Sequence, residues 1–379
     1  MIPLAHRASP LSAAELTRYS RQIAMSSIGH RGQLRLKSAR VLVVGAGGLG
    51  SPVIAYLARA GVGTIGVIDD DLVAESNLHR QIVHDDLTVG QHKVESALAS
   101  IARANPHVRA VGHRERLDGR NWRRVLEGYD LVVDGTDDFA TRYLVSDATT
   151  ELGLPCVWGT VLDTDGQVAT FWSHSPLGVT LRDLYPDEPP ASALSCATAG
   201  VLGPLCGVVA SWMAADAVKM IVGLGEPLLG RMLSIDAVDG STVEIRVRRR
   251  NDEASSTGID RHPAEPVPDS PHDLISWISV SELRLRLHQP DSLLLLDVRE
   301  DWERKIACIE GSVGIPLAEL DPDAITALPD LPIVVHCHRG SRARLAREIL
   351  NANGRPDVHV LHGGIDEWSA AVDSTIARY

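Results

Sequence analysis

Apolar runs that end in short polar loops recur along the chain and indicate buried β-strands. Residues 39–50 form one such run, which ends in a glycine turn, and residues 51–61 follow with helical spacing. Residues 64–71 and 129–138 are further apolar runs that end in acidic residues. Strands that alternate with helices predict an α/β fold with a parallel, doubly wound sheet, whose ligands bind at the carboxyl ends of the strands.

The same pattern returns after a polar interruption. Residues 251–273 carry four prolines and almost no apolar side chains, a composition typical of an extended linker. Residues 292–300 and 332–340 are again strand-like runs followed by polar loops, and residues 341–354 have the spacing of an amphipathic helix. We therefore predict a Rossmann-like nucleotide-binding domain over 12–250, a proline-rich linker over 251–278, and a small α/β domain over 279–379.

Composition narrows the class of protein. The chain has 379 residues, 44% of them hydrophobic, and a net charge of −12, which argues against a general nucleic-acid-binding role. Five cysteines without a CxxC pair argue against a disulfide scaffold. No signal peptide is evident at the N-terminus, and the uncharged run 198–215 is interrupted by glycine and proline, as expected for a buried helix. These features predict a cytoplasmic protein that does not cross a membrane.

The glycine turn has the spacing of a nucleotide-binding loop. Gly45, Gly47 and Gly50 form a G-x-G-x-x-G motif between a strand and a helix, where backbone N–H groups can contact phosphate. Asp69 ends the next strand, where a carboxylate can accept hydrogen bonds from ribose hydroxyls. This motif alone suits an NAD(P)-dependent dehydrogenase equally well.

Three further residues favour ATP. Arg80 and Lys93 could bind a triphosphate, which carries more charge than a dinucleotide pyrophosphate. Asp137, placed by the pattern at the end of a strand, could hold Mg²⁺ on those phosphates. Either cation by itself could instead form a surface salt bridge, and only the whole spacing favours the phosphate-binding interpretation.

Several separated motifs then carry a family resemblance. Residues 18–23 (RYSRQI), 76–82 (SNLHRQI) and 89–97 (VGQHKVESA), with the glycine loop, resemble ubiquitin-activating-like adenylyltransferases of bacterial molybdopterin and thiamin biosynthesis. The resemblance covers almost all of 12–250. It implies that MgATP adenylates the C-terminal glycine of a small ubiquitin-like sulfur-carrier protein that ends in Gly-Gly.

The resemblance also implies site residues. The ATP site would be lined by Gly45, Gly47, Gly48, Gly50, Asp69, Ser76, Asn77, Leu78, His79, Arg80, Lys93, Asp137 and Asp138, with Mg²⁺ on Asp137. Arg21 would reach into the site of a second subunit, which implies a homodimer. Cys196 would be the thiol of a crossover loop, although it could also be a small residue packed before a buried helix.

Two departures from the family pattern stand out. His79 occupies a position where glutamine is commoner, and we expect this change to be tolerated. Many relatives bind structural zinc through two CxxC pairs, the first of which would fall near Thr180 and Asp183, and neither pair is present. We therefore predict no zinc site.

A second reactive loop lies in the C-terminal domain. Cys337, His338, Arg339, Gly340, Ser341 and Arg342 follow a strand and precede a helix, so backbone N–H groups and the helix dipole can stabilise a thiolate. A metal site at 336–338 is a poor alternative, because neighbouring strand residues point to opposite faces. A phosphatase is a better rival, but only four residues separate Cys337 from Arg342, which suits a group smaller than phosphate.

This domain resembles a single-domain rhodanese. The resemblance rests on residues 295–300, 309–317, 336–342 and 361–368, and it implies that Cys337 carries a persulfide. Arg299, Arg339 and Arg342 would support the loop or form an electropositive rim for partner docking. Cys308 would be a packing residue.

Together the two resemblances imply adenylation of the carrier followed by sulfur transfer from Cys337, with Cys196 as a second thiol. The sulfur donor could be a cysteine desulfurase or thiosulfate. The alternatives are an NAD(P)-dependent oxidoreductase fused to a rhodanese, and an inactive scaffold that docks the carrier.

Overall fold

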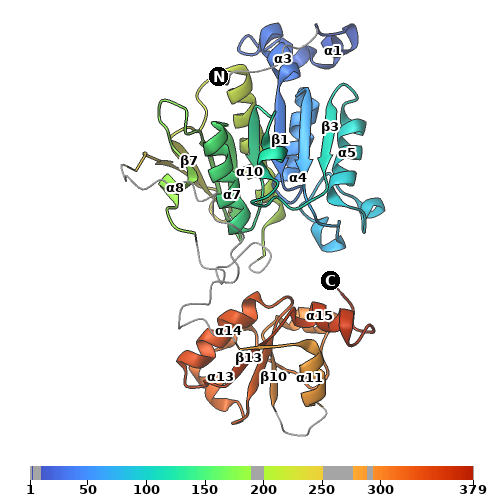
Figure 1. The fold of residues 1–379 in the computed structure, drawn as a ribbon, viewed down its shortest axis with the longest axis vertical. Coiled ribbons are helices and arrows are strands. Elements are labelled where there is room, and N and C mark those ends of the chain that lie inside the picture. Colours follow the sequence, from blue (N-terminus) through green and yellow to red (C-terminus); the bar gives the residue numbers. More distant parts are fainter. Residues whose placement is uncertain (1, 3–9, 189–199, 251–275, 288–292, 379) are drawn as a thin grey trace. The chain divides into compact units, whose positions relative to one another are not determined.

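A computed structural model describes residues 2, 10–188, 200–250, 276–287 and 293–378. These residues fall into two compact units, one before residue 251 and one after residue 275 (Figure 1). Most of the predicted linker and Cys196 lie outside the described residues, so each unit is considered by itself.

The larger unit is built on an eight-stranded sheet with the order β3-β2-β1-β4-β5-β6-β7-β8. Strands β3, β2, β1, β4 and β5 run parallel, as the alternation of strands and helices predicts. The strands are β1 Arg40–Val44, β2 Thr64–Ile68, β3 Arg109–His113, β4 Leu131–Asp134, β5 Cys156–Leu162, β6 Asp165–Phe171, β7 Arg231–Asp236 and β8 Thr242–Arg246.

The other end of this sheet is antiparallel, which the sequence pattern did not predict. Strands β5 and β6 are joined by a two-residue turn, in which Asp163 has a positive φ of 53°. A turn of this length connects antiparallel neighbours, whereas a parallel pair needs a crossover of a dozen or more residues. The sheet is therefore mixed, with a Rossmann-like parallel half.

Helices cover both faces of the larger sheet. The α3, α4, α5 and α10 side chains pack on one face, and α6 and α7 pack on the other. The helices of this unit are α1 Ala13–Arg18, α2 Ser20–Ile23, α3 Gly29–Ser38, α4 Gly50–Ala60, η1 Glu75–Asn77, η2 Asp86–Thr88, α5 Lys93–Ala104, α6 Trp122–Leu126, α7 Phe139–Leu152, α8 Leu181–Leu184 and α10 Gly203–Val222.

Helix α10 is long and apolar enough to span a membrane by length and composition. However, 61% of its most apolar window is buried inside the unit, where it packs against α4, β5 and β6. It is a core helix, as the interrupted apolar run predicts.

The smaller unit has a five-stranded parallel sheet with the order β11-β10-β12-β13-β9. Helices α13 and α14 pack on one face, and α11 and α15 pack on the other. Its elements are β9 Trp277–Ile278, α11 Val280–Leu287, β10 Leu294–Asp297, α12 Asp301–Ile306, β11 Val313–Gly314, η4 Leu317–Glu319, α13 Pro322–Ala327, β12 Ile333–His336, α14 Ser341–Ala352, β13 Val358–Leu361 and α15 Gly364–Ala371.

Candidate functional sites

The glycine loop lies between β1 and α4, at the carboxyl edge of the parallel strands. Gly45 has a φ of +86°, and a Cβ on Gly50 would lie 1.8 Å from the Gly45 carbonyl oxygen. The Asp69 carboxylate accepts hydrogen bonds from the backbone N–H groups of Ala46 and Asp71, both at 2.8 Å. Burial raises the pKa of Asp69, an effect opposed by Lys93 and these two donors. The loop and Asp69 therefore form one hydrogen-bonded unit.

The predicted cations lie near this loop. Arg80 lies across Gly48, where a glycine Cβ would be 3.2 Å from the Arg80 Cδ atom. The Arg80 Nη1 atom donates to the His79 ring at Nε2 (2.6 Å), and partial burial and the Arg80 charge lower the pKa of His79. Since an imidazole nitrogen accepts a hydrogen bond only when unprotonated, this contact requires the neutral ring.

Lys93 begins α5 and is buried, with its Nζ atom 2.7 Å from the exposed carboxylate of Asp71. Ser76 and Asn77 form η1 with Glu75, and Leu78 follows it directly. The Asn77 side chain accepts from the Ala74 N–H at 3.2 Å. Thus the segment from 76 to 80, which follows β2, and Lys93, at the beginning of α5, lie at the same edge of the sheet as the glycine motif.

The loop that carries Asp137 and Asp138 packs against the glycine loop. Strand β4 ends at Asp134 rather than at Asp137, because Asp134 is the buried residue that continues the strand and Gly135 then turns toward Gly45. Asp137 is exposed on this loop, and Asp138 caps α7 by accepting from the Thr141 N–H at 2.9 Å.

Two buried charged side chains, Asp134 and Arg142, hold this loop through Thr136. The Asp134 carboxylate accepts from the N–H and the hydroxyl of Thr136 at 3.0 and 2.7 Å. The Arg142 guanidinium, on α7, donates to the Thr136 carbonyl at 3.1 and 2.8 Å. Because all three polar groups of Thr136 are held, the conformation of the 135–138 loop is fixed from within. Sequence reasoning missed both residues, although Asp134 was the first acidic residue after the apolar run.

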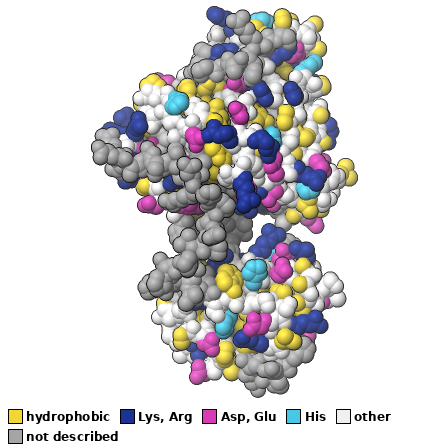
Figure 2. Space-filling model, in the orientation of Figure 1, with side chains coloured by type: hydrophobic (Ala, Val, Ile, Leu, Met, Phe, Trp, Pro, Cys, Tyr) yellow, Lys and Arg dark blue, Asp and Glu magenta, His cyan; other side chains and the backbone are white. Residues whose placement is uncertain are grey.

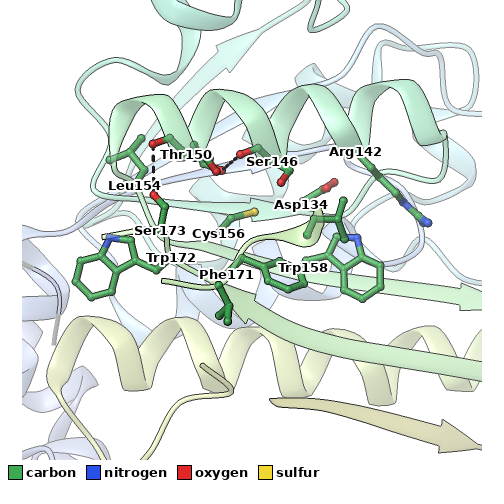
Figure 3. Close-up of a pocket in the computed structure, with 13 residues that line it drawn as sticks. Asp134, Arg142, Ser146, Thr150, Leu154, Cys156, Trp158, Phe171, Trp172 and Ser173 are labelled. Atoms are coloured by element: carbon green, nitrogen blue, oxygen red, sulfur yellow. Dashed lines mark hydrogen bonds between the residues drawn. The ribbon is translucent and has the colours of Figure 1, made fainter. Parts of the chain in front are cut away.

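Asp134 and Arg142 also line a small cavity with Cys156 and Trp158 (Figure 3). Its volume of about 10 Å³ approaches that needed for one water molecule. Burial and the neighbouring Asp134 raise the pKa of the Cys156 thiol well above its ordinary value. Cys156 is therefore an unreactive buried thiol.

Arg21 does not join these residues within one chain. It is exposed on α2, and the neighbouring Gln22 donates to the carbonyl of Ala60 at the C-terminal end of α4. The glycine loop lies at the N-terminal end of that helix, about 15 Å away for its length.

The positions at which relatives would carry a first zinc-binding pair form a polar contact. The backbone N–H and the hydroxyl of Thr180 donate to the Asp183 carboxylate at 2.7 and 2.9 Å. The backbone N–H of Arg250, near the end of the larger unit, donates to the same carboxylate at 2.7 Å.

Cys337 follows β12 and is almost completely buried, at 1% exposure. Its sulfur accepts a hydrogen bond from the Gly340 N–H at 3.1 Å, and Gly340 has a φ of +109° just before α14. The N–H groups of Ile365 and Asp366 donate to the carbonyls of Cys337 and His338 at 3.0 and 3.1 Å. Cys337 is thus held between the beginnings of α14 and α15.

The three arginines considered for this loop have different surroundings. Arg299 is fully buried and donates to Asp297 and to the Ala307 carbonyl. Arg342 forms a bidentate pair with the buried Glu303, at 2.6 and 2.7 Å. Arg339 is 71% exposed and lies 3.5 Å from Asp366. Because both Nη atoms of Arg342 donate to the Glu303 carboxylate, this arginine is not oriented toward the phosphate of a phosphatase substrate.

Two further expectations concern neighbouring residues. Cys308 is exposed, so its interpretation as a packing residue is wrong: its position follows α12, on a surface segment. His336 is fully buried, 3.7 Å from Asp297, and burial lowers its pKa to about 4. Among the described residues, the carboxylates close enough to share a metal ion are Asp69, Asp70 and Asp71, not residues 336–338.

Charged side chains of both signs are interspersed over the visible face of each unit (Figure 2). Such a surface differs from the continuous basic face that a nucleic-acid-binding protein presents.

Comparison with known proteins identifies both units. The ThiF family matches residues 19–256, and the rhodanese-like domain matches residues 279–371. A probable adenylyltransferase/sulfurtransferase MoeZ of Mycobacterium tuberculosis is 42% identical over 386 aligned positions, covering 100% of this chain and 98% of the relative. The adenylyltransferase and sulfurtransferase MOCS3 of Drosophila ananassae is 35% identical, covering 97% of this chain and 86% of the relative.

Solved structures agree on the fold. A crystal structure of E. coli MccB with ATP has a TM-score of 0.56 and 22% identity, covering 62% of this chain and 72% of that chain. A crystal structure of PaaA has a TM-score of 0.53 and 21% identity, covering 66% of this chain and 79% of that chain. The full-length relatives set aside the oxidoreductase and inactive-scaffold alternatives. The chain therefore belongs to the ThiF family, as an adenylyltransferase and sulfurtransferase in which a rhodanese-like domain follows the ThiF domain.

Proposed function

We propose that this enzyme uses MgATP to adenylate the C-terminal glycine of a small ubiquitin-like sulfur-carrier protein that ends in Gly-Gly. It then transfers sulfur from a Cys337 persulfide to make the carrier thiocarboxylate. The observation that carries this proposal is the presence in one chain of a glycine loop whose Ala46 N–H donates to Asp69 and a Cys337 thiol whose sulfur accepts from a backbone N–H donor.

The larger unit fits ATP and Mg²⁺ by the chemistry of its residues. Among the described residues, only the Gln81 amide, at 3.8 Å, comes near the position of a Cβ on Gly47, which supports an open approach of a phosphate to the backbone there. Arg80 and Lys93 supply positive charge, and the exposed Asp137 carboxylate would hold Mg²⁺. Bound Mg²⁺ would neutralise charge on the triphosphate. The relative MccB was crystallised with ATP, which agrees with this assignment.

In the first step, a carboxylate oxygen of the carrier's C-terminus attacks the α-phosphorus of ATP, and the bond to pyrophosphate breaks. Arg80 and Lys93 stabilise the negative charge that leaves with pyrophosphate. The products are an acyl-adenylate and pyrophosphate.

In the second step, the terminal sulfur of the Cys337 persulfide attacks the acyl carbon, and AMP leaves. The product is an acyl disulfide on Cys337. A second thiolate, for which we propose Cys196, then attacks the Cys337 sulfur and releases the thiocarboxylate. This leaves a disulfide between the two cysteines, which an external dithiol must reduce before the next cycle.

A homodimer would complete the adenylation site. Arg21 lies at the opposite end of α4 from the glycine loop, which supports a role for Arg21 in the site of a second subunit. Tyr56 on α4 and Val208 and Trp212 on α10 are large apolar side chains with exposures of 39–54%. Burying such side chains in a subunit interface would stabilise the dimer.

The setting of this reaction follows from its chemistry. A free thiol and a persulfide persist in a reducing cytoplasm, where a cysteine desulfurase or thiosulfate would supply the sulfur. The proposed partners are therefore a carrier protein and a sulfur donor, with neither nucleic acid nor membrane.

Carrier-dependent exchange of pyrophosphate into ATP tests the first step. We expect exchange by the wild-type enzyme and its loss in Asp137→Ala. Because Glu348 is exposed on α14 in the other unit, Glu348→Ala serves as a control that retains exchange. Failure to exchange with any β-grasp carrier that ends in Gly-Gly would refute the adenylation proposal.

A further inference from the structure

The rim of the Cys337 loop includes a half-exposed tryptophan that the mechanism above does not use. Trp277 lies on the edge strand β9 and is 39% exposed. Its ring lies 3.9 Å from the position of a Cβ on Gly340, the residue whose N–H donates to the Cys337 sulfur. Gly340 therefore lies between Trp277 and the Cys337 sulfur. We call Trp277, Gly340, Arg344 and the exposed Arg339 the loop rim.

Arg344 completes an aromatic and cationic surface. It lies on the second turn of α14, with its guanidinium carbon 5.0 Å from the centre of the Trp277 ring. Its Nε atom is buried, and among the described residues it has no hydrogen-bond partner. On the other side, the His362 ring meets Trp277 edge-on, with ring centres 5.7 Å apart. The Trp277 ring thus contacts both the Arg344 guanidinium and the His362 ring, which hold it in place.

We propose that the loop rim binds the extended C-terminal tail of the adenylated carrier and guides its acyl carbon to Cys337. This inference rests on the proposed function and names the surface that recognises the carrier. Because Cys337 is 1% exposed and Gly340 is buried, only a slim, extended segment can reach the sulfur. A Gly-Gly tail has no side chains beyond Cα, so its backbone can lie flat on the Trp277 ring.

The polar chemistry is also complementary. The Arg344 guanidinium places a positive charge beside the Trp277 ring, where the tail would lie. The acyl-adenylate carries an anionic phosphate in its mixed anhydride with the carboxyl group, and Arg339 and Arg344 place positive charge beside it. Arg299 and Arg342 do not contribute to this surface, since both are tied to carboxylates inside the unit.

Two acceptors distinguish recognition of the carrier from chemistry at the sulfur. The full-length enzyme, loaded with thiosulfate, is assayed for thiocyanate formation with cyanide and for thiocarboxylate formation with a Gly-Gly carrier and MgATP. We expect Trp277→Ala and Arg344→Met to raise the ratio of the carrier KM to the cyanide KM about tenfold. Trp277→Phe, which keeps an aromatic face, should restore most of the difference. Leu285→Ala, at a 72% exposed position on α11, is the matched control.

Three results would overturn the inference. Equal losses with both acceptors would mean that Trp277 only supports the loop. An unchanged ratio would mean that the tail does not contact the rim. Slower loading from a cysteine desulfurase, with unchanged transfer to the carrier, would assign the rim to the sulfur donor. If the wild-type enzyme forms thiocyanate but no thiocarboxylate with any carrier, the proposed function itself fails.

Discussion

At the scale of single residues, the proposed adenylation site includes a loop that two buried side chains hold in place. Asp134 and Arg142 hold Thr136 and so fix the loop on which Asp137 is exposed. Replacing one member of a buried charged pair leaves the other without compensation. These two residues are therefore positioning residues for Asp137.

Asp134→Asn tests this role. The change keeps the side-chain shape but removes the negative charge near Arg142, so the loop should lose its fixed geometry. We expect the rate of pyrophosphate exchange to fall by up to about a hundredfold, because a displacement of about 1 Å in a positioning group can have an effect of this size. Ser146→Ala, which alters the same cavity, is the control. Unchanged kinetics in Asp134→Asn would show that the contacts of Asp134 with Thr136 are not needed to position Asp137.

His79 offers a second residue-scale prediction. The neutral ring accepts a hydrogen bond from Arg80, and the lowered pKa of His79 keeps it neutral at pH 7. Below that pKa the ring gains a proton, loses the contact and repels Arg80. Exchange activity should therefore fall as the pH is lowered below 6.5, more steeply in wild type than in His79→Gln, whose amide oxygen still accepts. Identical pH profiles for the two enzymes would contradict this role.

At the scale of secondary-structure elements, the sequence predicted well what depends on local pattern. The parallel strands, the glycine loop and the helix after Cys337 follow from apolar runs and turn residues, and the structure has each of them. The antiparallel half of the larger sheet was missed, because a two-residue turn at Asp163–Thr164 has no glycine to mark it. Glu303, Trp277 and Arg344 were missed because their partners are distant in sequence. A contact across about 40 residues, such as that of Arg342 with Glu303, leaves no periodic signal.

The buried end of β12 makes the smaller unit sensitive to acid. The pKa of His336 is about 4 in the folded protein and 6.5 when exposed, so the unfolded chain takes up a proton first as the pH falls. The contribution of neutral His336 to the free energy of unfolding is complete above pH 6.5. It decreases as the pH falls from 6.5 to 4, by about 3 kcal/mol in total. Urea unfolding of the full-length enzyme, followed by tryptophan fluorescence at pH 7 and pH 4.5, should detect this loss. His336→Leu should flatten the dependence, and an equally steep loss in that variant would refute its origin.

At the scale of the whole molecule, the proposed homodimer uses residues of two subunits in each adenylation site. Arg21 and Asp137 would come from different chains, so Arg21→Ala and Asp137→Ala should each abolish exchange as pure dimers. When the two variants are mixed and reassociated at random, about half of the dimers are heterodimers, and each heterodimer has one intact site of two. Exchange activity should therefore return to about a quarter of the wild-type value. No recovery on mixing, with heterodimers verified by mass, would place Arg21 and Asp137 in the same site of one chain.

The central claim is that one chain activates a carrier at its first unit and transfers sulfur from its second. The most direct test incubates Cys337→Ala with a Gly-Gly carrier, MgATP and thiosulfate, and follows both pyrophosphate exchange and the carrier mass. We expect Cys337→Ala to retain normal exchange without replacing oxygen by sulfur at the carrier's C-terminus, whereas the wild-type enzyme should do both. Formation of the thiocarboxylate by Cys337→Ala at the wild-type rate would contradict it.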